Sequence, residues 1–254
     1  MSSILETHAQ TCDSPAALWG HIDQIYCISL TQRSDRRQSA QQGFDRIGLN
    51  GRVQFVLVDG HPTNSEQGIF ESHIACLRAG LAAGAQNILI FEDDVIFRRF
   101  STRVLARAIR FMKSNADWQI FFFGCFVWSS QKTSFESVLR VRYRCTAHAY
   151  VVNRPFAEKL VEQHWREVAY DDLLSNMAGQ HCYACYPAFA FQSASSTDNN
   201  NLRGIDRARR LVGGLYRLQR WNEFSSRHLR TLIWIHVGIG LVMACMILLR
   251  WLFG

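Results

Sequence analysis

The chain has 254 residues, of which 48% are hydrophobic and 12% aromatic. This is long enough for one substantial α/β domain with an appendage, and the apolar content excludes extensive disorder. The formal net charge of +7 would suit a nucleic acid, an anionic membrane surface or a phosphorylated ligand. The basic excess, however, lies mainly in a tail of arginines near the C-terminus, so we do not expect the main domain to bind nucleic acid.

The first half of the sequence alternates strand and helix patterns. Short apolar runs indicate buried strands, and apolar residues at intervals of three and four indicate helices. The expected strands lie in residues 24–30, 53–60, 87–97 and 118–124, and the expected helices in residues 31–48, 68–84 and 101–114. The alternation predicts an α/β fold with a mixed, mainly parallel sheet and helices on both faces.

The second half is less regular. Residues 137–144 and 147–153 have the pattern of two strands paired with each other, and residues 154–164 and 170–179 that of helices. The segment "HCYACYPAF" contains two cysteines at a spacing that zinc uses, but no second cluster completes a set of four ligands. We therefore interpret it as a strand, and the eight cysteines of the chain as reduced thiols.

The sequence predicts three parts: a main α/β domain over residues 20–200, a basic juxtamembrane segment over residues 201–230, and a C-terminal transmembrane helix over residues 231–250. The run "TLIWIHVGIGLVMACMILL" has about the 20 apolar residues that a membrane span needs. More arginines precede this run than follow it, so the expected orientation leaves the main domain in the cytoplasm, anchored to the membrane.

Three carboxylates stand together in "NILIFEDDVIFRR", at Glu92, Asp93 and Asp94, within an otherwise apolar segment. Asp59 ends the preceding strand in the same way. Ligands of open α/β sheets bind at the carboxyl ends of the strands, and carboxylates there can hold a divalent cation that also contacts substrate phosphates. We expect Mn²⁺ or Mg²⁺ at this edge, with Asp94 as the first ligand and Asp93 beside it.

Basic residues follow the first strand in "LTQRSDRR", where Arg33 and Arg36 lie at the start of a helix and would attract phosphate. The chain has no GxxxxGK[ST] loop and no GxGxxG after this strand, which argues against a P-loop nucleotidase and a dinucleotide-binding fold. A metal among carboxylates suits transfer from a nucleotide diphosphate, because the cation neutralises the departing phosphate.

The same segments resemble glycosyltransferase family 25, the group of bacterial lipooligosaccharide galactosyltransferases that is related to the collagen galactosyltransferases. The similar motifs are "IYCISLTQRSDRR", "VLVDG", "GIFESHIACLRAG", "LIFEDDV", "DWQIFFFG", "AHAYVVNRPFAEKLV" and "YDDLL...CYACYPAFAFQ". They occur in this order over residues 25–192. The chain departs from the family pattern at Ser29, where asparagine is usual, and at Gln119, where an acid is common.

The resemblance implies a GT-A-like fold and an inverting transfer of a hexose, commonly galactose in this family, from a UDP-sugar to a cell-surface glycan such as lipopolysaccharide or lipooligosaccharide. It makes Glu92, Asp93 and Asp94 the nucleotide-sugar and metal motif. It also places Ser72 and His73 near the donor.

Inverting transfer needs a base that deprotonates the acceptor hydroxyl. Asp171 and Asp172, at the start of a predicted helix, match the family's Asp-containing helix, and Asp171 is the better positional match, although helix capping explains either residue about as well. Asp198 is a further expected metal ligand. Two alternatives stay open: a metal-dependent nucleotidyltransferase or phosphotransferase, and a non-catalytic, membrane-tethered binding module.

Overall fold

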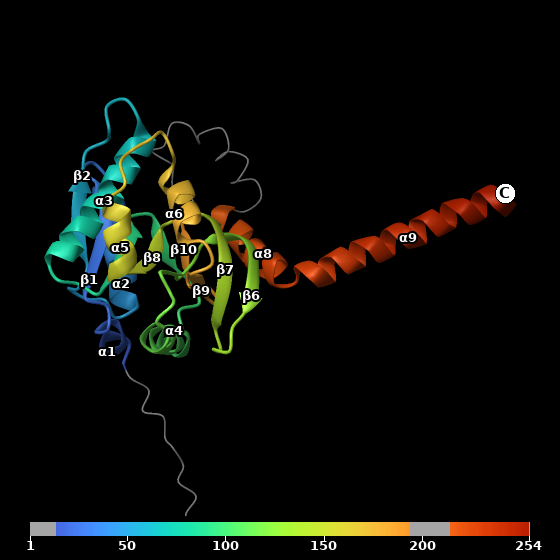
Figure 1. Ribbon diagram of the computed structural model, residues 1–254, viewed down its shortest axis with the longest axis horizontal. Coiled ribbons are helices and arrows are strands. Elements are labelled where there is room, and N and C mark those ends of the chain that lie inside the picture. Colours follow the sequence, from blue (N-terminus) through green and yellow to red (C-terminus); the bar gives the residue numbers. More distant parts are fainter. Residues whose placement is uncertain (1–13, 194–213, 254) are drawn as a thin grey trace, which may run out of the picture.

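The computed structural model describes residues 14–193 and 214–253, which form a mixed eight-stranded sheet between helices (Figure 1). The strand order is β2-β1-β3-β8-β5-β9-β7-β6, and a separate two-stranded sheet pairs β10 with β4. The strands are β1 (Gln24–Leu30), β2 (Gln54–Val58), β3 (Asn87–Glu92), β4 (Val95–Phe97), β5 (Ile120–Phe122), β6 (Phe126–Lys132), β7 (Val138–Cys145), β8 (Ala149–Asn153), β9 (Cys182–Cys185) and β10 (Ala190–Gln192).

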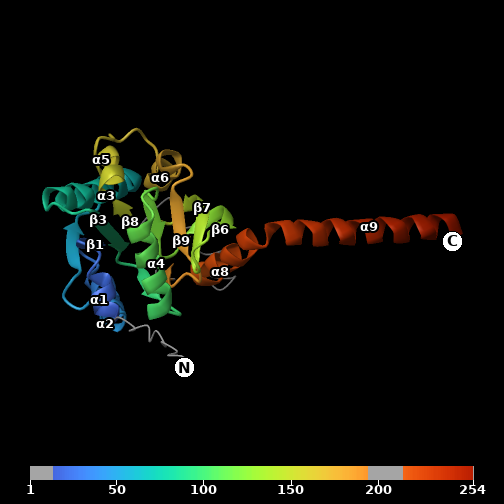
Figure 2. The same ribbon diagram turned by 60° about the horizontal axis from the view of Figure 1, so that its bottom comes forward.

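Helices α1 (Pro15–Trp19), α2 (Ser34–Arg46), α3 (Ser65–Ala82), α4 (Thr102–Ser114), α5 (Arg154–Val161) and α6 (Tyr170–Ala178) cover the two faces of the large sheet. The described chain ends with α8 (Gly214–Arg227) and α9 (Leu229–Phe253). Strand β3 shows how the layers arise: Leu89 and Phe91 pack with α1, α2 and α4 in one core, whereas Ile88 and Ile90 pack with α3, α5 and α6 in the other. Successive side chains of a strand point to opposite faces, and Figure 2 shows α3, α5 and α6 together on one side.

The mixed α/β architecture expected from the sequence is confirmed, but the parallel majority is wrong. In the large sheet β1 pairs in parallel with β2 and β3, and β5 with β9, whereas the contacts β3–β8, β5–β8, β6–β7 and β7–β9 are antiparallel. The expected pairing of residues 137–144 with 147–153 is also wrong, because β5 and β9 lie between β7 and β8.

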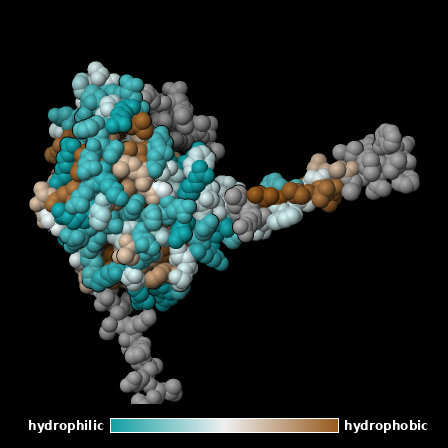
Figure 3. All heavy atoms as spheres, in the orientation of Figure 1, coloured by the Kyte–Doolittle hydropathy of each residue, from teal (hydrophilic) through white to brown (hydrophobic). Residues whose placement is uncertain are grey.

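The predicted transmembrane helix over residues 231–250 is contradicted. The segment is helical in α9, which extends away from the sheet in both ribbon views (Figures 1 and 2). Within the part of the chain that the structure describes, however, no helix combines the length and the apolar character needed to cross a membrane. A span requires about 20 apolar residues in succession, and the described portion of α9 does not supply that run, although its apolar atoms are exposed (Figure 3).

Helix α8 belongs to the predicted basic juxtamembrane segment over residues 201–230, yet it packs on the sheet through polar side chains. Asn222 accepts a hydrogen bond from the Val127 N–H at 2.8 Å and donates one to the Val127 carbonyl at 2.9 Å. The buried Gln219 amide donates to the Ala190 carbonyl at 3.0 Å. Because Val127 is on β6 and Ala190 on β10, α8 ties the outer strand of the large sheet to the small sheet.

Two glycines allow the close packing on which the site depends. A Cβ atom on Gly80 of α3 would come within 2.6 Å of the Ile88 side chain on β3. A Cβ on Gly124, just after β5, would come within 1.8 Å of the Ala190 carbonyl oxygen. Any side chain at these positions would push α3 away from β3, or β10 away from β5.

Candidate active site

The acidic triplet stands where β3 ends, at the edge of the sheet that the sequence predicts. Glu92 is the last residue of β3, Asp93 and Asp94 form the following turn, and β4 begins at Val95. Backbone hydrogen bonds fix the turn: the Glu92 N–H donates to the His148 carbonyl at 3.1 Å, and the Asp93 N–H to the Ile28 carbonyl at 3.0 Å. The carboxylates therefore sit between the end of β1 and the start of β8.

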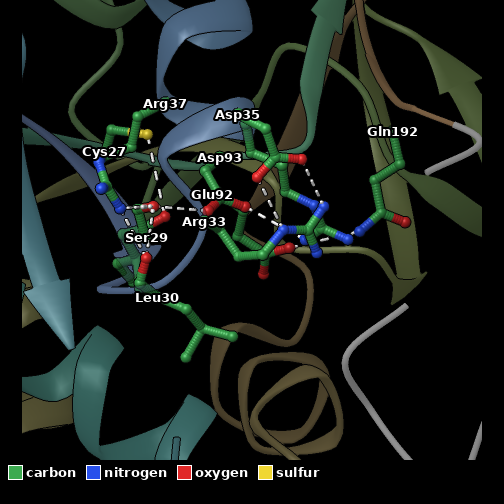
Figure 4. A network of polar contacts seen from close by, with 11 residues as sticks. Cys27, Ser29, Leu30, Arg33, Asp35, Arg37, Glu92, Asp93 and Gln192 are labelled. Atoms are coloured by element: carbon green, nitrogen blue, oxygen red, sulfur yellow. Dashed lines mark hydrogen bonds and ion pairs between the residues drawn. The ribbon is translucent and has the colours of Figure 1, made fainter. Parts of the chain in front are cut away.

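Asp93 is buried, and both of its carboxylate oxygens accept hydrogen bonds. Ser29 Oγ donates to Oδ2 at 2.6 Å, and Arg36 Nη1 donates to Oδ1 at 3.3 Å (Figure 4). Arg37 supports the same network by donating to Ser29 Oγ at 3.3 Å and to the Leu30 carbonyl at 2.6 Å. Asp93 thus joins β1, β3 and the first turn of α2 as a paired, buried charge.

Arg33 lies just before α2 and forms a two-point contact with Asp35. Its Nε and Nη2 atoms each lie 3.0 Å from a carboxylate oxygen of Asp35 (Figure 4). The hydrogen bond from Arg33 lowers the pKa of the exposed Asp35 carboxyl to about 2. Arg33 itself is only 14% exposed, so the predicted phosphate-binding arginines are both held in place by carboxylates.

Glu92 points away from Asp93, toward α3 and β10. Its Oε1 lies 3.4 Å from His73 Nε2, and its Oε2 accepts a hydrogen bond from Gln192 Nε2 at 3.3 Å. Burial, followed by repulsion from Asp93, raises the pKa of Glu92 to about 7. The side chain keeps 28% of its surface exposed, so it can still accept a hydrogen bond from a ligand.

Asp94 differs from its neighbours because its Oδ1 atom is buried and makes no hydrogen bond to any residue that the structure describes. Burial and the nearby Glu92 charge raise the pKa of Asp94 to about 8. An orphaned carboxylate oxygen suits a divalent cation, which prefers oxygen ligands. By the same test Asp93 fits poorly, because both of its oxygens are engaged.

The described residues do not complete a metal site by themselves. Across residues 14–193 and 214–253, no three His, Cys, Asp or Glu side chains are arranged to hold a metal ion. Asp198, the expected late ligand, lies outside the described residues. Asp94 is therefore the residue of the predicted set whose geometry fits a cation, and Mg²⁺ in particular usually completes its shell with water and substrate phosphates.

The predicted donor-site pair on α3 divides into two roles. Ser72 donates its hydroxyl to the Gly68 carbonyl of its own helix at 2.6 Å. His73 is buried and lies between Glu92 and Tyr150, with its Nδ1 atom 2.9 Å from the Tyr150 hydroxyl. Burial lowers the pKa of His73 to about 3, so the imidazole is neutral at physiological pH.

The structure separates the two predicted bases. Asp171 accepts hydrogen bonds from the Tyr143 hydroxyl and from the backbone N–H groups of Thr146 and Ala147, so it holds the turn before β8. Asp172 is exposed at the surface of α6, and Asp59 is exposed after β2. None of these three contacts the triplet through a hydrogen bond that the structure describes.

Sequence reasoning missed three residues next to the triplet: Gln192, Tyr150 and Tyr170. Gln192 reaches Glu92 because β10 pairs with β4 in antiparallel register, with Gln192 opposite Val95. Tyr150 and Tyr170 reach His73 from β8 and α6. The available signal was weak: each is a polar group inside an apolar run, which a packing role explains equally well.

Comparison with known proteins gives relatives with a shared family name, although no family model matches the chain. A "Glycosyltransferase 25 family member" of Aedes aegypti is 23% identical over 192 residues, which is 63% of this chain and 32% of that protein. The human "Inactive glycosyltransferase 25 family member 3" is 26% identical over 202 residues, 65% of this chain and 33% of that protein. The chain spans about a third of the length of these curated relatives.

Solved structures give weaker likenesses. The A197 protein of STIV aligns with a TM-score of 0.46 and 11% identity, over 67% of this chain and 85% of that one. A glycosyltransferase involved in glycosylation of the major capsid of PBCV-1 aligns with a TM-score of 0.42 and 11% identity, over 73% of this chain and 100% of that one. These TM-scores are too low to establish a relationship. The sequence relatives confirm the similarity of this chain to the glycosyltransferase 25 family that its ordered motifs predict.

Proposed function

We propose that this chain is an inverting glycosyltransferase that moves a hexose, with galactose as the first choice, from a UDP-sugar to a glycan acceptor of the lipopolysaccharide or lipooligosaccharide type. The observation that carries the proposal is the buried Oδ1 atom of Asp94, which has no hydrogen-bond partner among the described residues, at a sheet edge flanked by Arg36 and Arg33. The arrangement offers a place for a cation and for the diphosphate beside it. The named relatives support sugar transfer as the reaction class.

In this proposal the protein provides charged groups that stabilise the departing diphosphate and side chains that orient the donor. Asp94 would hold Mn²⁺ or Mg²⁺, which when bound neutralises charge on the departing UDP. Arg33 and Arg36 would face the phosphates, since guanidinium groups match phosphate oxygens in geometry and charge. Glu92, with part of its surface exposed, would accept a hydrogen bond from a hydroxyl of the donor.

The catalytic base is chosen by asking which of the two predicted carboxylates is still able to accept a proton from the acceptor hydroxyl. A base must come within about 3 Å of the acceptor hydroxyl, and the oxygens of Asp171 already accept three hydrogen bonds. Asp172 has an exposed carboxylate and is therefore the better base of the two. Asp171 would position the turn before β8.

The test is turnover by the purified chain with UDP-galactose, UDP-glucose and UDP-N-acetyl sugars, each with Mn²⁺, with Mg²⁺ and with a chelator. Release of UDP together with a hexose mass increase on the acceptor is the expected result, and Asp94→Asn should abolish it. The matched control is Asp117→Asn, which changes an exposed acid that was not assigned to the site. Pyrophosphate release would instead show a nucleotidyltransferase, and cation-independent transfer would exclude the role given to Asp94. One relative is named inactive, so the assay also decides whether this chain turns over at all.

A further inference from the structure

A chain of buried polar side chains leads from the interior of the protein to Glu92. The Tyr170 and Tyr150 hydroxyl oxygens are 2.8 Å apart, the Tyr150 oxygen is 2.9 Å from His73 Nδ1, and His73 Nε2 is 3.4 Å from Glu92 Oε1. The His73 ring also stacks on the Tyr170 ring, with centroids 4.2 Å apart and an interplanar angle of 7°. Tyr150, Tyr170 and His73 are each at most 2% exposed, so water does not compete for these contacts.

The number of available protons determines which group donates in each of these hydrogen bonds. A neutral imidazole carries one ring proton, and each tyrosine carries one hydroxyl proton. Every contact is satisfied when Tyr170 donates to Tyr150, Tyr150 donates to His73 Nδ1, and His73 Nε2–H donates to a Glu92 oxygen. The opposite tautomer, with the proton on Nδ1, would place the Nε2 lone pair against the Glu92 carboxylate.

Exchanging donor and acceptor in every one of these hydrogen bonds is also unfavourable. In that case Glu92 would donate to His73, His73 to Tyr150, and Tyr150 to Tyr170, which leaves the Tyr170 hydroxyl proton without an acceptor among the described residues. A buried donor without a partner is costly. The forward direction is therefore the one that the packing selects.

We infer that Tyr150 and Tyr170 are positioning residues that hold His73 in the Nε2–H tautomer, and that His73 thereby fixes Glu92 as a hydrogen-bond acceptor for a hydroxyl group of the sugar nucleotide. The contact between Glu92 and the sugar nucleotide rests on the proposed function, whereas the tautomer of His73 does not. His73 donates a hydrogen bond to Glu92 Oε1, and Gln192 donates one to Oε2, so both oxygens of the carboxylate are held in position. A ligand with a hydroxyl in place is then preferred over one that lacks it.

The direct test is nitrogen NMR of the full chain labelled with ¹⁵N-histidine, with the His73 signals assigned by their loss in His73→Gln. The expected spectrum has a protonated Nε2 and an unprotonated, hydrogen-bonded Nδ1. Tyr150→Phe removes the donor to Nδ1 and should shift the His73 signals toward a mixture of tautomers. Tyr183→Phe is the matched control, because Tyr183 is equally buried but interacts with Arg140 on β7 and should leave the His73 signals unchanged.

Binding of UDP-galactose, measured by calorimetry, tests the second half. Loss of one hydrogen bond of ordinary strength corresponds to about fivefold weaker binding, which is the change expected for Tyr150→Phe and for Tyr170→Phe. A wild-type His73 protonated on Nδ1, or a Tyr150→Phe protein with unchanged His73 signals and unchanged binding, would overturn the inference. An Nε2–H tautomer in a protein that binds no sugar nucleotide would support the hydrogen-bond chain while refuting the proposed function.

Discussion

Replacing Asp94 with asparagine should make the protein more stable at alkaline pH while removing the proposed cation site. The Asp94 carboxyl has an ordinary pKa of 3.8 and a folded-state pKa of about 8. In the unfolded chain the group loses its proton near pH 4, whereas the folded chain keeps it until about pH 8. Unfolding therefore releases a proton throughout this window, and the stability of the wild type falls as the pH rises from about 4 to about 8.

The difference between the folded-state and unfolded-state pKa values of Asp94 determines how much stability the wild type loses. It corresponds to about 6 kcal/mol of unfolding free energy at the alkaline end of the window. Desolvation is the largest cause of the raised pKa of Asp94, but the residue is only partly buried, so solvent screens the charge and lowers this energy. We therefore expect about half of the full value, about 3 kcal/mol, as the gain of Asp94→Asn at pH 8. At pH 4 both proteins bury a neutral group, and the difference should stay below about 1 kcal/mol.

The assay is urea unfolding followed by circular dichroism, at pH 4 and pH 8 in the presence of a chelator. Asp59→Asn, a change at an exposed position, should stay within about 0.5 kcal/mol of the wild type at both values. Excess Mn²⁺ should then stabilise the wild type by about 2.7 kcal/mol at a hundredfold excess over its dissociation constant, and should leave Asp94→Asn unchanged. Equal stability of the two proteins at pH 8 would mean that Asp94 is hydrated and loses its proton near its ordinary pKa of 3.8.

Three further substitutions test the network around the site. Asp93→Ala removes the carboxylate that pairs with the largely buried Arg36 guanidinium and should cost about 3–5 kcal/mol in urea unfolding, against about 0.5 kcal/mol or less for Asp59→Ala; a similar cost for both would refute a structural role for the buried carboxylate. Asp171→Asn should lose about 1–3 kcal/mol, because one of its amide atoms must face a donor, and an unchanged unfolding free energy would show that the turn before β8 does not depend on it. Asn222→Ala should speed hydrogen exchange at the Val127 amide, which it pairs at 2.8 Å, and protection as strong as in the wild type would contradict the role of α8 in securing β6.

Local patterns in the sequence identified most elements but not their neighbours. The expected strand over residues 24–30 coincides with β1, and the expected helix over residues 101–114 agrees with α4 to within one residue. Both have a period that local side chains determine, two for a strand and 3.6 for a helix. Strand pairing is set by packing across the whole sheet, so the sequence did not indicate that β9, from far along the chain, separates β7 from β5.

Helix α8 shows a different limit of sequence reading. Its arginines suggested a basic juxtamembrane segment, because charged residues in a tail are normally solvated. The residues that hold it to the sheet are instead Gln219, Asn222 and Glu223, which bond to backbone groups of β6, β10 and the segment before β10. Polar side chains that pair with backbone leave no hydrophobic period, so the packed face could not be seen in the sequence.

The acidic triplet explains why sequence could locate the site and could not assign its members. Glu92, Asp93 and Asp94 are adjacent and chemically alike, but their partners come from elsewhere: Ser29 is 64 positions from Asp93, and His73 is 19 positions from Glu92. At the end of a strand, neighbouring side chains point to opposite faces, which sends Glu92 toward α3 and Asp93 toward α2. Asp94, in the turn, is reached by neither set of partners and keeps an oxygen for a cation. The choice of Asp94 as the metal ligand, which rested on position in a motif, now has a physical reason that the sequence alone did not contain.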